Sequence, residues 1–194
     1  MDKITLGTRN VSIEFPGVKA LSNVDFEIET GVIHALMGAN GAGKSTLMKV
    51  LAGSNPGYTG DVLYNGNPVE LRNPAAAKKL GIQIVYQEVD MALIPTLTVA
   101  ENVMFNDLVM NMGHKQFVNY GKIRKDAKEA LARLNVNIDV RRMCGTLTLA
   151  QKQMVLIARA VQSACNFLIL DEPTAPLSDT ETEELFRVVR HLRK

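Results

Sequence analysis

One short segment limits what this chain can fold into more than any other feature. It reads Gly38-Ala39-Asn40-Gly41-Ala42-Gly43-Lys44-Ser45 and fits the pattern G-x-x-x-x-G-K-[ST] at every fixed position. A mostly apolar run over residues 32–37 precedes it, and a helical pattern from residue 44 to a stop at Gly53 follows it. Glycines let backbone N–H groups approach an anion, and the helix start presents the positive end of its dipole. The segment therefore predicts a phosphate-binding loop between a buried strand and a helix.

The side chains of this loop, together with a second segment, can act on a polyphosphate. The Lys44 ammonium can neutralise the β- and γ-phosphates, and the Ser45 hydroxyl can ligate Mg²⁺. The apolar run Phe167–Leu170 ends at Asp171 and Glu172. Open α/β sheets bind ligands at the carboxyl ends of their strands, so Asp171 can hold the Mg²⁺ shell and Glu172 can accept a proton from an attacking water. The alternative is a solvated strand end, which the presence of the glycine-rich loop makes the weaker interpretation.

The order of strand and helix signals predicts an α/β core interrupted by helices. Apolar patterns predict strands over 11–15, 24–28, 61–64, 82–86 and 167–170, with an Asn65-Gly66 hairpin turn after the third. Helix starts are predicted at Asn73-Pro74 and at the capping boxes Thr98–Glu101 and Ser178–Glu181. Helical patterns dominate from Thr98 to about Gln162, with breaks near Gly113, Gly121 and Gly145. The sequence thus predicts an inserted helical subdomain over about 95–162.

Composition argues against several other classes of protein. The 194 residues include 22 basic and 20 acidic side chains, and a formal net charge of +2 is too small to indicate a nucleic-acid groove. No stretch reaches the ~18 apolar residues of a membrane span, and no apolar signal-peptide core is visible at the N-terminus. Cys144 and Cys165 belong to no CxxC pair, so we expect free thiols in a reducing compartment. We expect a soluble chain that reaches a membrane only through a partner.

Further segments indicate which kind of phosphate-loop protein this is. Neither the guanine-reading motifs of GTPases nor the arginine lid of small-molecule kinases is recognisable. Instead, Leu147-Thr-Leu-Ala-Gln151 opens a helical pattern, Gln87 follows the strand predicted over 82–86, and Ala175-Pro-Leu-Ser178 follows Glu172-Pro-Thr. With the loop, this set resembles the ATP-binding cassette (ABC) ATPases through essentially the whole chain. The phrases FPGVKAL, GIQIVYQE, LTVAENVMF and EPTAPLSDTETEELF resemble the first cassette of bacterial simple-sugar importers of the ribose, xylose and galactose type.

The resemblance implies a fold and a role for each motif. The fold would be a P-loop NTPase with an antiparallel β subdomain, a mostly parallel core sheet and an inserted α-helical subdomain. Residues 1–95 and 163–194 would form the ATP-binding core, and residues 96–162 the helical signature subdomain. Glu172 would polarise the attacking water, and Ser45, Gln87 and Asp171 would contact Mg²⁺. The residues expected to contact ATP are Phe15, Gly38, Ala39, Asn40, Gly41, Ala42, Gly43, Lys44, Ser45, Thr46, Thr148, Ala150 and Gln151.

The alternative for Phe15, which the resemblance would stack on adenine, is an ordinary core aromatic of a strand. The resemblance also implies partners. Two cassettes would close head to tail, each ATP lying between one phosphate loop and the opposite LTLAQ signature. The pair would sit on the cytoplasmic side of the membrane and drive permease subunits that receive a monosaccharide from a periplasmic or extracellular binding protein. An ABC ATPase for another cargo and a non-hydrolysing regulatory module remain as alternatives.

Several positions depart from the family pattern. Leu149 and Ala150 replace the two glycines of the usual LSGGQ signature, and Pro176 removes a backbone donor from the segment over 175–178. The family also places a further strand after the last helix, ending in a histidine that touches the γ-phosphate. This chain ends at Lys194, before such a strand, so we expect a cassette that is incomplete at its C-terminus. These departures favour ATP binding over ATP hydrolysis by this chain alone.

Overall fold

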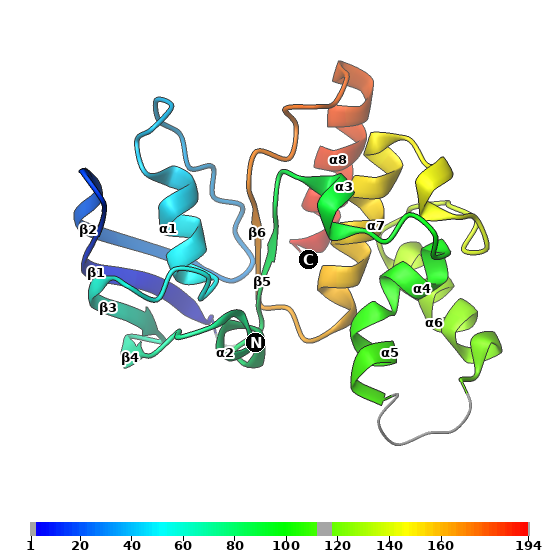
Figure 1. Cartoon of the computed structure of the whole chain (residues 1–194), viewed down its shortest axis with the longest axis horizontal. Coiled ribbons are helices and arrows are strands. Elements are labelled where there is room, and N and C mark those ends of the chain that lie inside the picture. The colour runs from blue at the N-terminus through cyan, green and yellow to red at the C-terminus, as the bar shows by residue number, and fades with distance from the viewer. Residues whose placement is uncertain (1–2, 112–117, 194) are drawn as a thin grey trace. The chain divides into compact units, whose positions relative to one another are not determined.

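The computed structural model describes residues 3–111 and 118–193, which form two compact units (Figure 1). The first unit runs to Ile84 and takes in Ala164–Asp171. The second comprises Val85–Ser163 and Glu172–Leu192. An antiparallel sheet dominates the first unit and helices dominate the second, which confirms the predicted α/β class. The exact limits predicted for the core and the helical subdomain remain predictions.

A four-stranded antiparallel sheet with the order β2-β1-β3-β4 carries the first unit. Its strands are β1 (Thr5–Phe15), β2 (Val18–Glu29), β3 (Thr59–Tyr64) and β4 (Asn67–Val69). Asn65 and Gly66 join β3 to β4 with φ angles of 51° and 71°, the left-handed geometry that a tight Asn-Gly hairpin requires. The strands predicted over 11–15, 24–28 and 61–64 are therefore confirmed, together with the hairpin turn.

The core of the first unit joins this sheet to a helix and to a second, smaller sheet. Helix α1 (Lys44–Leu51) contacts β2 and buries Leu47, Val50 and Leu51 among the apolar side chains of the sheet. Strands β5 (Ile82–Val85) and β6 (Phe167–Leu170) pair with each other and add Ile82 and Phe167 to the same core. Both strands were predicted from their apolar runs. Helix α2 (Pro74–Lys79) lies between β4 and β5 in the chain.

The apolar run before the phosphate loop is not a strand, contrary to the prediction for residues 32–37. Within the described residues the second sheet consists of β5 and β6, and neither pairs with this segment. A buried strand needs hydrogen-bonding neighbours for its backbone. Here Val32 and Ile33 are each 47% exposed and Met37 is 88% exposed. The segment is therefore an apolar but unpaired connection between β2 and the loop.

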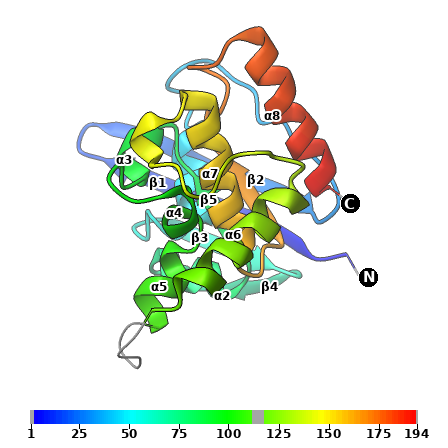
Figure 2. The same ribbon diagram turned by 90° about the vertical axis from the view of Figure 1, so that its right-hand side faces the viewer.

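Helices build the second unit, with α7 (Leu149–Gln162) at its centre (Figure 2). Helix α7 contacts α3, α4, α6 and α8. The other elements of this unit are α3 (Val89–Ala92), α4 (Val99–Val103), α5 (Phe105–Asn111), α6 (Tyr120–Arg133), the 3-10 helix η1 (Cys144–Thr146) and α8 (Asp179–Leu192). Eight of the fourteen residues of α7 are buried, which follows from the nearly continuous apolar run in its sequence.

Two of the three predicted helix breaks can be compared with the structure. Gly145 lies in η1, so the break there is confirmed. Gly121 lies in the first turn of α6, which begins at Tyr120 after a non-helical Val118 and Asn119, so the break predicted near Gly121 is confirmed. Asn119 explains where the helix begins, because its side chain accepts a hydrogen bond from the backbone N–H of Lys122 and caps α6. Gly113 lies outside the described residues.

All three predicted helix starts are confirmed. The Asn73 side chain accepts from the backbone N–H of Ala76, and reciprocal bonds join Thr98 to Glu101 at the start of α4. Ser178 and Glu181 exchange the same pair of bonds before α8. Among the helices that the structure describes, none combines the length and the apolar character needed to cross a membrane.

Candidate functional site

The phosphate loop lies in the first unit, and the structure requires glycine at position 43 of this loop. Gly41 and Gly43 have φ angles of 80° and 87°. A Cβ atom on Gly43 would lie 2.5 Å from the carbonyl oxygen of Ala20 and 2.8 Å from Cδ2 of Leu21. These separations are shorter than a real side chain tolerates. The loop can therefore pack against β2 only because residue 43 has no side chain.

Helix α1 begins without the side-chain cap that other helices of this chain possess. Its N-cap residue is Gly43, and no acidic residue lies in its first turn. By contrast, Asn73, Thr98 and Thr148 cap α2, α4 and α7 with side-chain oxygens. The first backbone N–H groups of α1, which include those of Ser45 and Thr46, are thus left for an anion, with the helix dipole in the favourable direction. This arrangement fits a phosphate group.

The Lys44 side chain folds back over the loop. Its ammonium donates to the carbonyl oxygens of Gly38, at 2.8 Å, and of Ala39, at 2.9 Å. The backbone N–H of Ala42 donates to the Ala39 carbonyl oxygen at 3.1 Å, which closes a tight turn around the exposed Asn40 and Gly41. A positive charge and backbone donors therefore meet at the start of α1, as the sequence pattern predicted.

Two oxygen side chains from distant parts of the sequence meet beside this helix start. Ser45 Oγ donates to Oδ1 of Asp171 at 2.9 Å, across 126 residues of sequence. Asp171 directly follows β6 and is only 8% exposed. A hydroxyl and a carboxylate are hard oxygen ligands of the kind that Mg²⁺ binds. The pair can therefore hold Mg²⁺ next to a bound phosphate, and the structure brings together the two residues that the sequence had linked to this metal.

Glu172 follows Asp171 but belongs to the second unit. Its side chain is exposed, and its backbone has a φ angle of 45°, in the left-handed region that non-glycine residues rarely adopt. Such a conformation costs on the order of 1–3 kcal/mol and is common at functional sites. The strand end therefore presents a buried carboxylate and an exposed carboxylate in succession, a difference suited to separate roles.

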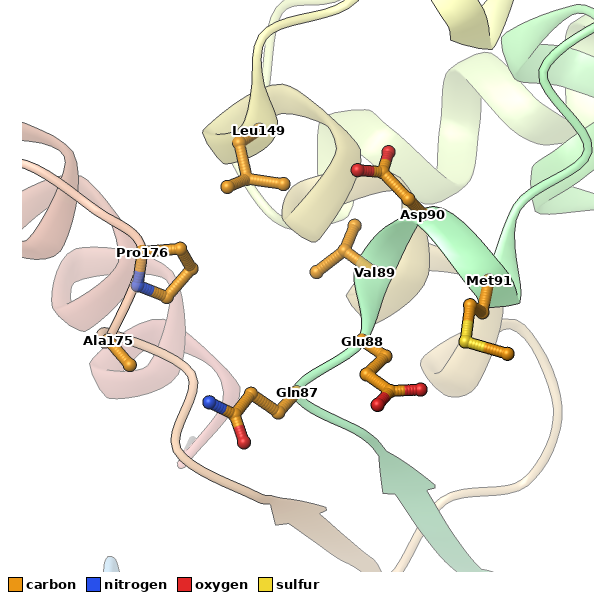
Figure 3. A pocket seen from close by; sticks show the side chains of 8 residues that line it. All are labelled: Gln87, Glu88, Val89, Asp90, Met91, Leu149, Ala175 and Pro176. Carbon is orange, nitrogen blue, oxygen red and sulfur yellow. The ribbon is translucent and has the colours of Figure 1, made fainter.

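A pocket of about 530 Å³ in the second unit joins three of the motif segments (Figure 3). Gln87 lies at its edge, with its side chain extended toward the segment of Ala175 and Pro176. Leu149, the first of the two residues that replace signature glycines, contributes from the first turn of α7. The remaining lining residues follow Gln87 in the chain and are Glu88, Val89, Asp90 and Met91. The three segments therefore lie side by side in the second unit.

The signature segment begins α7 with a capping box that the sequence analysis missed. The Thr148 side chain accepts from the backbone N–H of Gln151 at 3.3 Å, and the Gln151 side chain accepts from the backbone N–H of Thr148 at 3.2 Å. The spacing Thr-x-x-Gln would have predicted it. Ala150 is buried, whereas Thr148 is exposed. Thr148 and Gln151 therefore cap the start of α7 reciprocally.

Phe15 closes β1 at the hairpin that leads to Val18 and is 42% exposed. An aromatic ring that served only the core would be buried more fully. This exposure favours a stacking role over the alternative of core packing.

Sequence reasoning also missed two basic residues of α7. Lys152 forms an ion pair with Asp90 in α3, and Arg159 donates to backbone and side-chain oxygens around Asn102. Burial lowers the pKa of Arg159. The one available signal was a basic residue inside the apolar pattern MVLIARAV, which indicates a buried charge that must have partners.

Comparison with known proteins gives a consistent result. The ABC transporter family profile matches residues 21–175. The ribose import ATP-binding protein RbsA 1 of Rubrobacter xylanophilus is 44% identical over 97% of this chain, and RbsA 2 of Rhizobium meliloti is 45% identical over 97%. The chain spans 37% and 36% of the lengths of these two relatives.

Solved structures agree with the sequence relatives. An ATP-binding cassette of an ABC transporter in its ADP conformation aligns with a TM-score of 0.83 and 25% identity, covering 100% of this chain and 78% of the other. The cbiO1 protein of Clostridium perfringens, described as part of the ABC transporter complex cbiONQ, aligns with a TM-score of 0.79 and 27% identity, covering 97% of this chain and 73% of the other.

Proposed function

This chain belongs to the ABC transporter family, and on that premise we propose that it binds and hydrolyses ATP to power import of a monosaccharide. The observation that carries the proposal is the hydrogen bond between Ser45 and Asp171 beside a helix start that has no side-chain cap. A phosphate cradle and a pair of oxygen ligands for a cation are both needed by an enzyme that acts on ATP with Mg²⁺.

ATP binding rests on the first unit. The backbone N–H groups of the loop from Gly38 to Gly43 and of the first turn of α1 would bind the phosphates, together with the Lys44 ammonium. Ser45 and Asp171 would hold Mg²⁺, joined by Gln87. The metal, when bound, would neutralise charge on the β- and γ-phosphates. The exposed ring of Phe15 would stack on the adenine.

Hydrolysis would use Glu172 and the signature segment of a second cassette. Glu172 would accept a proton from the water that attacks the γ-phosphate. In a head-to-tail pair, the α7 start of one cassette, with Thr148, Ala150 and Gln151, would face the γ-phosphate bound by the other. Closure of the pair would be driven by ATP and reversed after its hydrolysis.

The transport role rests on the relatives. Two of them are named ribose import ATP-binding proteins, and another is named a putative ribose/galactose/methyl galactoside import ATP-binding protein. We propose the same cargo class for this chain, with a membrane permease as the partner on the cytoplasmic side of the membrane. The two signature replacements, Leu149 and Ala150, favour a second candidate, a nucleotide-binding module that does not turn over ATP.

Steady-state release of phosphate from ATP separates the two candidates. We expect the full-length protein to release phosphate with Mg²⁺ present and to lose that activity when the metal is chelated. We expect Lys44→Ala to weaken ATP binding by at least about 100-fold, because it removes a charge-assisted contact to two phosphates. Unchanged affinity in this variant would refute the placement of the phosphate site. ATP binding without phosphate release would select the regulatory module.

A further inference from the structure

Two basic side chains of α7 form contacts, here called ties, with the short helix that follows Gln87. Lys152 Nζ lies 2.6 Å from Oδ1 of Asp90, and Arg159 Nη1 donates to the carbonyl oxygen of Ala92 at 2.7 Å. Both acceptors belong to α3 (Val89–Ala92). Lys152 and Arg159 are seven residues apart, which is about two helical turns, so they project from the same face of α7. Helix α3 is therefore held near each of its ends by one neighbouring helix.

The Arg159 tie is the centre of a larger polar network. Its Nε donates to the Asn102 carbonyl oxygen at 2.7 Å and its Nη2 to Asn102 Oδ1 at 2.8 Å, while the guanidinium carbon lies 5.5 Å from the centre of the Phe105 ring. Asn102 is fully buried. Its side chain accepts from the backbone N–H of Ile94 and donates to the carbonyl oxygens of Ile94, Leu97 and Thr98.

The contacts of Asn102 also fix the segment that follows α3 in the chain. Since Asn102 pairs with both backbone groups of Ile94, the connection between α3 and α4 cannot move without breaking a buried network. The guanidinium, in turn, has oxygen acceptors of neutral groups around it. A partly buried cation of this kind carries a desolvation cost, and loss of its hydrogen-bond partners would be destabilising. An apolar side chain at position 159 would have avoided this desolvation cost. The presence of an arginine there therefore indicates a specific role.

The position of the ties in the chain supplies that reason. Asp90 lies three residues after Gln87, and Lys152 lies four residues after Thr148, which caps α7. The ion pair between them thus joins the segment that carries Gln87 to the helix start that carries the signature. Its Lys152 side chain is only 18% exposed, although Asp90 is 71% exposed. The pair is therefore partly protected from solvent and from screening by salt.

We propose that Lys152 and Arg159 are positioning residues that hold Gln87 in a fixed place relative to the α7 start at Thr148. The proposal rests on the proposed function, because Gln87 matters only if it senses nucleotide. A displacement of Gln87 would then be carried to the signature end of α7 as movement of one rigid piece. The two basic residues would act through α3 and not through contact with ATP or Mg²⁺.

The test uses the full-length protein and centres on the contact between Lys152 and Asp90, because Asp90 is 71% exposed and the protein should fold without this ion pair. The variants are Lys152→Met, Asp90→Asn and the exchanged pair Lys152→Asp with Asp90→Lys. Lys125→Met is the matched control, since it removes a lysine from an ion pair with Glu129, at 3.9 Å, within α6 of the same unit. Arg159→Lys tests the second tie with its charge retained.

Three measurements are made on each variant. Hydrogen exchange of residues 87–94 without nucleotide reports whether α3 is held. Titration with a fluorescent ATP analogue reports binding at the phosphate loop. Phosphate release at varied ATP concentration gives kcat and KM separately.

We expect exchange over 87–94 to be about two- to fivefold faster in Lys152→Met, since a partly exposed ion pair contributes modestly. Its ATP affinity should stay within about twofold of the parent and its kcat should fall by about tenfold with KM unchanged. The exchanged pair should recover most of both losses, and Lys125→Met should behave like the parent. Arg159→Lys should accelerate exchange further.

Parent-like exchange in both Lys152→Met and Arg159→Lys would overturn the proposal. So would faster exchange with unchanged kcat, because α3 would then be held for stability alone. A parent protein that binds no ATP would instead refute the proposed function, and the exchange data would still decide whether the ties hold α3.

Discussion

At the scale of single residues, the clearest constraint is on Gly43. Its φ angle of 87° and the approach of Ala20 to its Cα leave no room for a methyl group. We expect Gly43→Ala to lower ATP affinity by at least about tenfold, because the loop must shift away from β2 to relieve the contact. Equilibrium titration with a fluorescent ATP analogue measures the effect.

The matched control for this change is Gly31→Ala. Gly31 has a similar φ angle of 79°, but a Cβ atom there would meet nothing within 4 Å. It should cost some stability and leave ATP affinity unchanged. Equal loss of affinity in both variants would show that backbone strain, and not the contact with β2, explains the effect.

A second residue-scale prediction concerns Cys165. Both cysteines are free, as expected from the sequence, and burial raises the pKa of Cys165 from 9.0 to about 11. A shift of this size leaves about 100-fold less thiolate at pH 8 than an unperturbed thiol has, so alkylation by iodoacetamide should be slowed to a similar extent. Mass spectrometry of the peptide that contains Cys165 gives the rate, with urea-unfolded protein as the reference.

The same pKa shift links stability to alkaline pH. The thiol ionises above pH 9 in the unfolded chain but only near pH 11 in the folded one, so its contribution is complete below pH 9 and is lost as the pH rises from 9 to 11. The free energy of unfolding should therefore fall over this range more steeply in the parent than in Cys165→Ala. Identical slopes would contradict the assigned burial of this thiol.

At the scale of elements, local sequence rules worked where a helix start depends on side chains close in the chain. Asn73, Thr98 and Ser178 each cap the helix predicted for them, because all the partners lie within three residues. The strand predicted over 32–37 failed for the opposite reason. An apolar run becomes a strand only where another strand pairs with it, and that partner is set by the whole fold.

The capping box before α4 allows an element-scale prediction. Thr98 Oγ1 accepts from the backbone N–H of Glu101, and Glu101 Oε2 accepts from the backbone N–H of Thr98. We expect Thr98→Ala to lower the free energy of unfolding by about 1 kcal/mol, the usual cost of losing a cap. Urea denaturation measures it. Thr98→Ser, which keeps the hydroxyl, should lose much less, and equal losses would attribute the effect to the threonine methyl group.

At the scale of the whole molecule, the sequence motifs indicated the residues of the candidate phosphate site more fully than the residues that hold the surrounding helices in place. Lys44, Ser45 and Asp171 were recognisable because phosphate and Mg²⁺ chemistry demands those residue types in a fixed pattern. The network of Asn102 and Arg159 was not, since its bonds run mostly to backbone oxygens, which any sequence supplies. The sequence could not indicate which distant carbonyl groups the fold would bring to the partly buried guanidinium of Arg159.

The strongest prediction at this scale concerns Glu172→Gln in the full-length protein. Glutamine has the same shape, so the left-handed backbone at this position and the neighbouring Asp171 should be undisturbed, and ATP should bind within about twofold of the parent affinity. The amide cannot accept a proton from water, so phosphate release should fall by about 100-fold or more. With hydrolysis stopped, ATP should hold two cassettes together, and light scattering should detect a larger species that appears only with ATP. Glu184→Gln, which removes the same charge from an exposed position on α8, should release phosphate like the parent. Normal turnover in Glu172→Gln would show that another group accepts the proton, and the strained carboxylate after β6 would then need a different explanation.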